Sequence, residues 1–304
     1  MKFAAIDIGS NAVRLLFKQV FEDGDGLIFK KDALFRVPIR LGEDVFSKQE
    51  VSADKAKRLV EVMTAFKHLI AAYQPTDYMA CATSAMREAS NGSQLVDEIR
   101  KRTDINLEIV DGKREAEIIY CNRIADMLSK KKSYLYIDVG GGSTEITLIA
   151  KNDIVTSHSF NLGTVRILNH LVSKSEWQEL KQWLKQHTKD YQPLAGIGSG
   201  GNINKMFDLS RKKRGKPLTY KKIKKIHNYV NSYSFEDRIK VLRLKPDRAD
   251  VIIPASKIFV SVMKWAKIKR IYVPQIGLSD GIIHVLYDRY KQGNSKNEVS
   301  VAAN

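Results

Sequence analysis

The chain has 304 residues, enough for two domains at the usual size of roughly 100 to 200 residues each. Hydrophobic residues make up 43% of the chain and charged residues 28%, which is typical of a folded globular protein and excludes a disordered one. The 51 Lys and Arg against 34 Asp and Glu leave a formal net charge of +17, which favours a polyanionic partner such as nucleic acid, a membrane surface or a phosphate-rich molecule.

Neither a signal peptide nor a membrane-spanning segment is predicted. Asp7 interrupts the apolar run at the N-terminus, and a proline and two lysines interrupt the longest apolar stretch, residues 251–266. Cys81 and Cys121 form no CxxC pair and are expected to be buried, reduced thiols. We therefore expect a cytoplasmic protein that does not enter a membrane.

The first predicted element is a hairpin. A β-favouring run at residues 2–7, a turn of Gly, Ser and Asn, and an apolar run at 13–17 supply its strands and turn. The same pattern returns at 133–150, where a strand that ends in Asp138 leads through three glycines into a second apolar run. Two copies of one pattern predict an internal duplication.

Helices and strands alternate along the rest of the chain. Between the hairpins we predict helices at 53–73, 92–102 and 113–128 and strands at 78–82 and 107–110. After the second hairpin we predict strands at 154–160, 194–197 and 270–273 and helices at 165–172, 175–187, several within 203–265, and 280–290. This alternation indicates an α/β fold of two similar domains, 1–128 and 129–279, with a disordered polar tail at 293–304.

The turn of the first hairpin is a candidate phosphate site. Glycine lets the backbone approach a phosphate closely, and Ser10, Asn11 and Arg14 add donors beside the turn N–H groups. An ordinary hairpin turn, in which Asp7 bonds the backbone, explains the same residues. The second copy, residues 138–145, has more glycine than a hairpin needs, so it favours a phosphate clamp.

A third glycine-rich turn, GIGSGG at 196–201, matches the G-x-G-x-x-G pattern of dinucleotide-binding folds. Such a site also needs an acidic residue about 20 positions later to bind the ribose. Lysines such as Lys216 and Lys221 occupy that region instead, so NAD is disfavoured as a cofactor.

Two further side chains allow both a functional and an ordinary interpretation. Arg87 follows a predicted strand in a loop of small residues, where its planar guanidinium suits either a bidentate phosphate contact or a surface position near a helix N-terminus. Glu115 falls in the first turn of a predicted helix, which favours any acidic residue. The six histidines lack the spacing of metal ligands.

A strongly basic segment covers residues 205–225, where ten Lys and Arg accompany a single acidic residue, Asp208. Such a segment is either a solvated surface or a track for a polyanion. Only Phe207 and Tyr220 interleave aromatic rings with the charges, which disfavours single-stranded nucleic acid as a partner.

Five blocks of sequence occur in an order that identifies a resemblance from residue 5 to about residue 281. They are AIDIGSNAVRLL at 5–16, ATSAMREASNG at 82–92, GKREAEIIY at 112–120, DVGGGSTEI at 138–146 and PDRADVIIP at 246–254. Together they resemble the exopolyphosphatase and guanosine pentaphosphate phosphohydrolase family of the actin-like ATPase superfamily. The resemblance implies an α/β fold of two actin-like (ribonuclease H-like) domains that face each other across an interdomain cleft. A final helix at about 280–292 is expected to pack back onto the first domain.

The resemblance also implies roles for individual residues. Glu115 would orient or deprotonate the attacking water, and Asp7, Asp138 and Glu145 would hold Mg²⁺ and position that water. The residues expected to bind the substrate phosphates are Ser10, Asn11, Arg14, Arg87, Asn91, Gly140, Gly141, Gly142, Ser143, Thr144, Gly200 and Gly201.

The activity implied is that of a Mg²⁺-dependent exopolyphosphatase, which hydrolyses the terminal phosphate from inorganic polyphosphate. Guanosine pentaphosphate or another nucleotide is an alternative substrate for the same chemistry. A sensor that binds polyphosphate or nucleotide without hydrolysis, and a kinase of the same superfamily, are alternatives of another class. A homodimer is compatible with the sequence.

Two departures from the family bear on substrate choice. Longer members add a C-terminal helical HD-type domain, whereas this sequence ends after two domains, which favours short substrates. Ser279 stands where the family often has an arginine, so one cation of the usual site is missing. The basic segment at 211–225 is a candidate substitute track for a polyphosphate chain.

Overall fold

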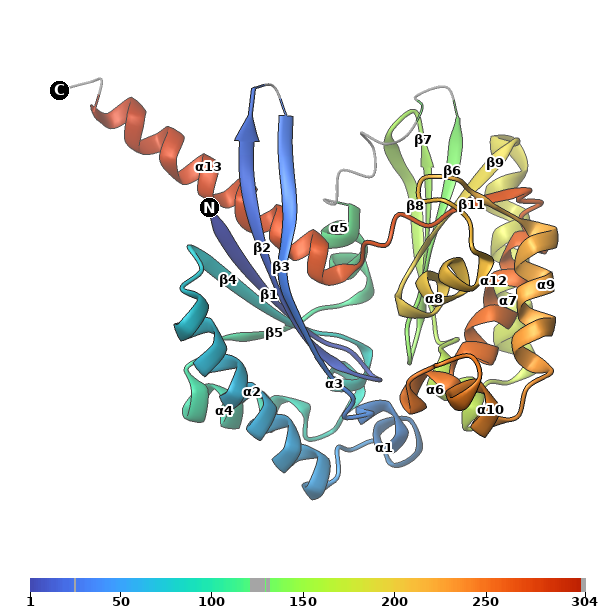
Figure 1. The fold of residues 1–304 in the computed structure, drawn as a ribbon, viewed down its shortest axis with the longest axis horizontal. Helices are drawn as coiled ribbons and strands as arrows, with labels where there is room; N and C mark the ends of the chain where they lie inside the picture. The colour runs from blue at the N-terminus through green and yellow to red at the C-terminus, as the bar shows by residue number, and fades with distance from the viewer. Residues whose placement is uncertain (25, 121–128, 130–131, 302–304) are drawn as a thin grey trace.

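Two mixed β-sheets with helices around them make up the molecule (Figure 1). The computed structural model describes residues 1–24, 26–120, 129 and 132–301, with side chains described as far as residue 293. The predicted α/β fold is confirmed. Within the described residues, no helix is long and apolar enough to cross a membrane.

The first sheet has the strand order β3-β2-β1-β4-β5. Its strands are β1 (Lys2–Ile8), β2 (Val13–Asp23), β3 (Gly26–Val37), β4 (Asp77–Ala82) and β5 (Leu107–Ile109). The antiparallel pairs β1–β2 and β2–β3 are followed by the parallel pairs β1–β4 and β4–β5. β1 is buried along nearly its whole length, as expected for a central strand covered on both faces.

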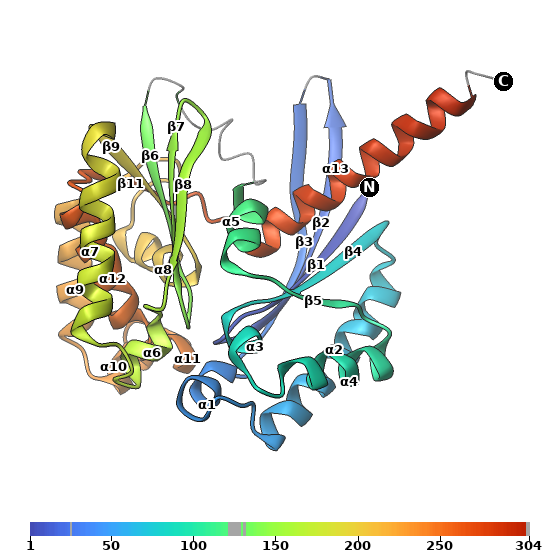
Figure 2. The same cartoon turned by 180° about the vertical axis from the view of Figure 1, so that it is seen from behind.

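Five helices belong to the first half of the chain. They are α1 (Leu41–Lys48), α2 (Ala53–Tyr73), α3 (Ser84–Glu88), α4 (Gly92–Thr103) and α5 (Gly112–Tyr120). Leu59, Met63 and Phe66 recur on one side of α2 and enter the core with residues of α1 and α4. α5 belongs to a separate apolar cluster on the side that faces the second sheet (Figure 2).

The second sheet has the strand order β10-β11-β9-β6-β7-β8. Its strands are β6 (Ser133–Val139), β7 (Thr144–Ala150), β8 (Asp153–Phe160), β9 (Leu194–Ser199), β10 (Leu218–Thr219) and β11 (Arg270–Tyr272). Without β10, the order β8-β7-β6-β9-β11 repeats that of the first sheet, with the same antiparallel and parallel neighbours. This repetition supports the predicted duplication.

The helices of the second half cover mainly the face of the sheet that points away from the first half (Figures 1 and 2). They are α6 (Thr164–Leu168), α7 (Lys174–Thr188), η2 (Lys189–Tyr191), α8 (Gly201–Ser210), α9 (Tyr220–Asn231), α10 (Phe235–Lys240), α11 (Pro246–Ala249) and α12 (Ile252–Trp265). A capping box between Ser173 and Glu176 begins α7.

The last helix, α13 (Leu278–Val301), returns to the first half and packs along β1, β2 and α5. Phe3 meets Tyr287 and Tyr290 edge to face, at centroid distances of 6.5 and 6.1 Å. The helix predicted to end near Tyr290 continues to Val301, so helix replaces much of the predicted irregular tail.

Three elements of the first half were absent from the sequence-based prediction, namely β3, α1 and α3, the last of which replaces the loop expected around Arg87. The predicted helix over 113–128 is present as α5 up to Tyr120, and its remainder, with Cys121, lies outside the described residues. The predicted helical region at 203–265 contains five separate helices and the short strand β10, which pairs with β11.

Candidate functional site

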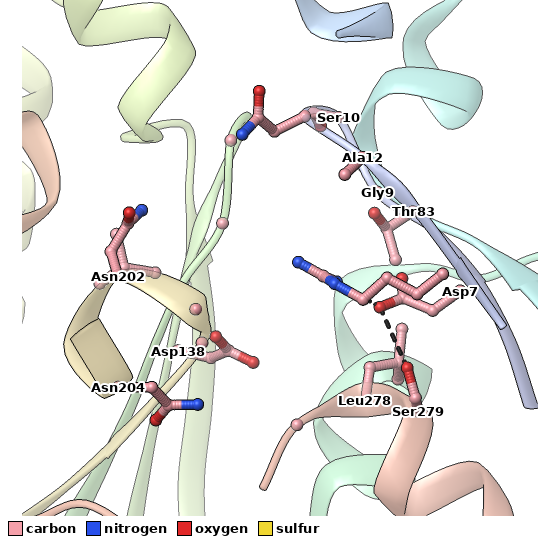
Figure 3. Close-up of a pocket in the computed structure, with 18 of the residues that line it drawn as sticks. Asp7, Gly9, Ser10, Ala12, Thr83, Asp138, Asn202, Asn204, Leu278 and Ser279 are labelled. Carbon is pink, nitrogen blue, oxygen red and sulfur yellow. Dashed lines mark hydrogen bonds and ion pairs between the residues drawn. The ribbon is translucent and has the colours of Figure 1, made fainter. Parts of the chain in front are cut away.

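A cavity of about 370 Å³ lies between the two sheets. The turn after β1 and the turn after β6 both line it, together with the start of α8 and the segment that leads into α13 (Figure 3). Each half of the duplicated fold therefore contributes the same kind of turn to one shared space.

The two turns have the same backbone geometry. Gly9 N–H donates to the carbonyl of Ala12 at 3.1 Å, and Gly140 N–H donates to the carbonyl of Ser143 at 2.9 Å. The turns also touch each other, because a Cβ added to Gly141 would lie 2.8 Å from Ser10 Cβ. Glycine is thus required at Gly141 by the close approach of the two halves.

Five carboxylates line this cavity, namely Asp7, Glu115, Asp138, Glu145 and Asp280, the last of which forms an ion pair with Lys18 at 2.6 Å. Asp138 and Glu145 are cross-strand partners on β6 and β7, and Glu115 belongs to the first turn of α5, as predicted. Figure 3 shows the Asp7 and Asp138 side chains on opposite walls. Glu115, Asp138 and Glu145 are 8%, 9% and 3% exposed, so these acids are all removed from water.

Burial of several acids together raises their pKa values. The pKa of Asp138 rises to about 7, first because of burial and then because of the charge of Glu145, with Arg14 opposing the rise. The pKa of Glu115 is raised well above its usual value by burial and by the charges of Glu145, Asp138 and Asp7. Burial also raises the pKa of Glu145. A site that binds a cation or moves a proton explains why such costly burial is retained.

The hydrogen bonds of the carboxylates differ from one acid to the next. Asp7 accepts from Arg14 at 2.5 Å and from Ser279 Oγ at 3.4 Å. Ser159 Oγ donates to Glu145 at 2.9 Å. Within the described part of the chain, Glu115 Oε2 is buried and has no hydrogen-bond partner. This oxygen is therefore the acceptor that a bound water or cation would satisfy.

The donor set suits Mg²⁺ in its chemistry. Among the described residues, no group of three or more His, Cys, Asp or Glu side chains is arranged to hold a metal ion by itself. Mg²⁺ needs few protein ligands, since one or two carboxylates commonly bind it while phosphate oxygens and water complete the octahedron. Asp138 and Glu145, with the unpartnered oxygen of Glu115 nearby in the same cavity, fit such a partial site.

Most of the residues predicted to bind phosphate line the cavity. They are Ser10, Asn11, Arg14, Gly140, Gly141, Ser143, Gly200 and Gly201. Ser10 Oγ is 2.8 Å from Ser84 Oγ, and Asn11 donates to the carbonyl of Asp247 across the cleft at 2.9 Å. The third glycine turn thus belongs to this same cavity, and Gly200 takes a φ of 98° that a side chain would strain.

Two predicted phosphate-binding residues instead have structural roles. The amide of Asn91 is hydrogen-bonded in both directions to the backbone of Val51, at 3.0 and 2.8 Å, so it anchors a loop. Thr144 is fully buried and donates to the carbonyl of Leu162, which gives it a structural role as well. Small polar residues in a glycine-rich context suit loop anchoring and ligand binding equally, which is why the sequence did not separate the two.

Gly142 and Arg87 lie behind the cavity wall. A Cβ on Gly142 would be 2.3 Å from the Phe46 ring, so Gly142 packs against the first half. Arg87 donates to the carbonyl of Val110 at 2.8 Å, and its charge lowers the pKa of both Glu115 and Glu145. Arg87 therefore acts on the carboxylates and does not line the cavity.

The cavity also contains cations that the sequence did not reveal. Lys31 and Arg36 reach it from β3, and Arg248 reaches it from α11. Burial, followed by the charges of Arg36 and Arg14, lowers the pKa of Arg248 to about 10. Arg248 lies within the block PDRADVIIP, so the sequence contained a motif that could have identified it as a site residue. The other two depended on β3, which was not predicted.

A family model described as the Ppx/GppA phosphatase family matches residues 27–290. A bifunctional 3-dehydroquinate synthase/phosphatase of Fusobacterium nucleatum is 27% identical over 86% of this chain, which spans only 43% of that relative. Exopolyphosphatase 1 of Mycobacterium leprae is 21% identical, over 99% of this chain and 94% of the relative.

Solved structures show the same fold. An exopolyphosphatase from Cytophaga hutchinsonii has a TM-score of 0.82 at 21% identity and covers 95% of this chain and 98% of its own. The Ppx/GppA family member from Aquifex aeolicus has a TM-score of 0.75 at 23% identity, with the same coverage. These likenesses show that the chain shares the fold of these proteins. With the match over most of its length, the chain belongs to the Ppx/GppA phosphatase family.

Proposed function

We propose that the protein is a Mg²⁺-dependent hydrolase that removes the terminal phosphate from inorganic polyphosphate. The observation that supports this most is the set of buried carboxylates, one with an unpartnered oxygen, facing two glycine-rich turns in a cavity that cations also line. Such a site offers a proton acceptor, cation ligands and phosphate donors in one place.

Glu115 is the proposed general base. Its raised pKa makes it a better proton acceptor near neutral pH than an ordinary glutamate, and Glu115 lines the shared cavity. It would take a proton from water as the water attacks the terminal phosphorus in line with the leaving oxygen. Arg87 behind it would oppose excessive protonation.

The phosphate chain would be held by the turns and by the cations. N–H groups at Gly141 and Ser143, with the Ser10 hydroxyl, surround the end where attack occurs. Arg248 and Lys31 would neutralise phosphates further along. Asp138 and Glu145 would hold Mg²⁺, which would supply charge neutralisation at the phosphoryl group.

The walls of the cavity favour polyphosphate over a nucleotide. The described residues that line the cavity include no Phe, Tyr, Trp or His ring on which a base could stack. The relative from Mycobacterium leprae is named as an exopolyphosphatase, while one from Aeromonas salmonicida, 21% identical over 93% of this chain and 59% of its own length, is named as a guanosine-5'-triphosphate,3'-diphosphate pyrophosphatase.

One observation favours the guanine nucleotide as a second candidate substrate. Asn202 and Asn204 line the cavity, and Asn204 Oδ1 is buried with no hydrogen-bond partner among the described residues. A base edge could use this acceptor in place of stacking. The test therefore compares polyphosphate with guanosine pentaphosphate as substrates.

The test measures phosphate release from short and long polyphosphate and from guanosine pentaphosphate, with Mg²⁺ or with a chelator. We expect release from polyphosphate by the wild type, and a loss of about 10²- to 10⁴-fold in Glu115→Gln with unchanged circular dichroism. Phosphate release only from guanosine pentaphosphate would make that nucleotide the substrate in place of polyphosphate. Tight binding of polyphosphate without release would identify a sensor and refute the hydrolase.

A cytoplasmic location is the second part of the proposal. Cys81 is a free, fully buried thiol whose pKa is raised to about 12, mainly by burial. An unreactive reduced thiol suits a reducing compartment. Fractionation of cells with an antibody to the protein would test this location.

A further inference from the structure

The glycine turn of the second half is fastened from behind by α6. Three consecutive carbonyls, those of Gly140–Gly142, all accept hydrogen bonds from this helix. The donors are Thr164 N at 3.0 Å, Val165 N at 2.9 Å and Arg166 Nε at 2.7 Å. Gly163 completes the contact, since a Cβ there would lie 2.2 Å from the carbonyl oxygen of Gly141.

These bonds determine where the amides of the turn point. In a trans peptide the C=O and the following N–H point in opposite directions. When α6 holds the carbonyl of Gly142, the N–H of Ser143 must therefore point away from α6. Ser143 lines the cavity, and its N–H donates to no described protein atom. Arg166 thus orients the Gly142–Ser143 peptide, because it holds that carbonyl.

The same guanidinium reaches the other half of the molecule. Arg166 forms an ion pair with Glu88 at the end of α3 and lies over the Phe46 ring of α1, with 4.0 Å between Cζ and the ring centroid. The Arg166 side chain is only 12% exposed. One side chain in the second half therefore bonds the phosphate turn and the first half at the same time.

The packing around Gly142 makes this link stiff. A Cβ at Gly142 would lie 2.3 Å from Phe46 and 2.5 Å from Ser84 Oγ. The turn, the Phe46 ring and the guanidinium are thus in direct contact, so a shift of one half against the other would displace the turn. A lysine at position 166 would lack the planar fork that serves both partners at once.

We propose that Arg166 is a positioning residue that aligns the Gly142–Ser143 peptide for the substrate phosphate through its bond to Glu88 in the opposite half. The inference rests on the proposed function in one respect, namely that phosphate binds at this turn. It adds that phosphate binding and contact between the two halves depend on each other.

The test uses four single variants of the full chain and one double variant. Glu88→Gln removes the charge across the cleft and leaves the Arg166 bond to the turn intact. Arg166→Gln removes both the bond to the Gly142 carbonyl and the ion pair with Glu88, and Arg166→Lys keeps only the positive charge. Glu98→Gln is the matched control, because Glu98 forms an exposed ion pair with Arg102 elsewhere in the first half.

Two readouts separate positioning from a simple loss of structure. Hydrogen exchange of the peptide that contains residues 140–144 is followed with and without inorganic phosphate, and KM and kcat are measured separately. We expect Glu88→Gln to raise KM about threefold to tenfold, consistent with a partly exposed ion pair, and to move phosphate-induced protection of the turn to a correspondingly higher phosphate concentration. Arg166→Lys and Arg166→Gln should behave alike and should both raise KM more than Glu88→Gln does. Glu98→Gln should behave like the wild type.

The double variant Glu88→Gln/Arg166→Gln should be no worse than Arg166→Gln alone, because both changes break one linkage. Additive effects, or an unchanged KM and unchanged exchange in Glu88→Gln, would overturn the inference while leaving the hydrolase standing. If the wild type releases no phosphate but the turn still shows Glu88-dependent protection by inorganic phosphate, the proposed activity fails and the positioning role stands.

Discussion

The two hairpins at the cavity differ at one matching position. In the first half, Asp7 on β1 is the cross-strand partner of Arg14 on β2. In the second half, Asp138 on β6 is the cross-strand partner of Glu145 on β7. The first pair forms an ion pair at 2.5 Å, whereas the second places two acids side by side. Burial raises the pKa of both acids, and the charge of Glu145 raises the pKa of Asp138 further.

A single change of charge therefore gives the duplicated hairpins different chemistry. The hairpin of the first half neutralises its own aspartate and leaves the Arg14 charge to act on Asp138 as well. The hairpin of the second half accumulates negative charge that only a cation or protons can relieve. We infer that the Asp7–Arg14 pair contributes positive charge toward the phosphates, whereas the Asp138–Glu145 pair contributes the ligands for the cation beside the phosphate-binding turn of the same half.

The largest effect is expected from removal of the second acid. Glu145→Gln should lower kcat by at least about 100-fold in saturating Mg²⁺, because a charge aimed at the reacting group is lost. Glu61→Gln, a change of an exposed glutamate on α2, is the control. Turnover near that of the wild type in Glu145→Gln would remove the distinction between the hairpins. The assay is phosphate release under initial-rate conditions.

Asp138→Asn should make the cation-free protein more stable at high pH. A carboxyl whose pKa rises from 3.8 to about 7 on folding favours the folded state fully below pH 4 and loses that contribution as the pH rises to 7. At pH 8 we expect a gain of about 2 kcal/mol in the free energy of unfolding, decreasing toward pH 5. Urea unfolding at both pH values measures it. An equal gain at both pH values, or a gain in the exposed control Asp288→Asn, would contradict this explanation.

The sequence predicted the parts of the site that local pattern defines. Both glycine turns, the aspartates that precede them and Glu115 are specified by contiguous residues, and the structure places them around one cavity. The order of the five sequence blocks identified the family resemblance, and that resemblance implied the fold. In these regions, turn chemistry and strand pattern agree with the tertiary structure.

The parts that depend on distant contacts were missed. β3 contains the polar run Lys30–Asp32, and its strand conformation comes from pairing with β2 across a register shift. Lys31 and Arg36 were therefore not recognised as cavity residues. Asn91 was assigned to phosphate because its block suggested it, although its amide holds the backbone of Val51.

Arg14→Gln should remove the positive charge of the first hairpin that acts on Asp138 of the second hairpin. The charge of Arg14 lowers the pKa of Asp138, so its loss should raise that pKa further and move the acidic limb of the pH–rate profile to higher pH. We expect KM to rise about tenfold, as for loss of one charge-assisted phosphate contact. Arg14→Lys keeps the charge, so it should restore the pH profile more than KM. An unchanged profile in Arg14→Gln would exclude this coupling.

The smallest expected effect concerns the basic segment outside the cavity. Arg211, Lys212 and Lys213 are exposed just beyond α8, the helix whose first residues line the cavity. Their replacement by Gln should raise KM about threefold for long polyphosphate and reduce its salt dependence, with no change for short chains. A matched triple change at Lys57, Lys67 and Lys101 in the first half is the control. Equal effects for both chain lengths would exclude a track.

The return of α13 to the first sheet has a consequence for biosynthesis. One face of β1 is completed by residues from the far end of the chain, as the contact of Phe3 with Tyr287 shows. On a translating ribosome this apolar face stays uncovered until α13 emerges, whereas the second sheet is encoded by one continuous stretch. We expect the second half to fold first and the nascent first half to recruit chaperones, although its residues are synthesised earlier.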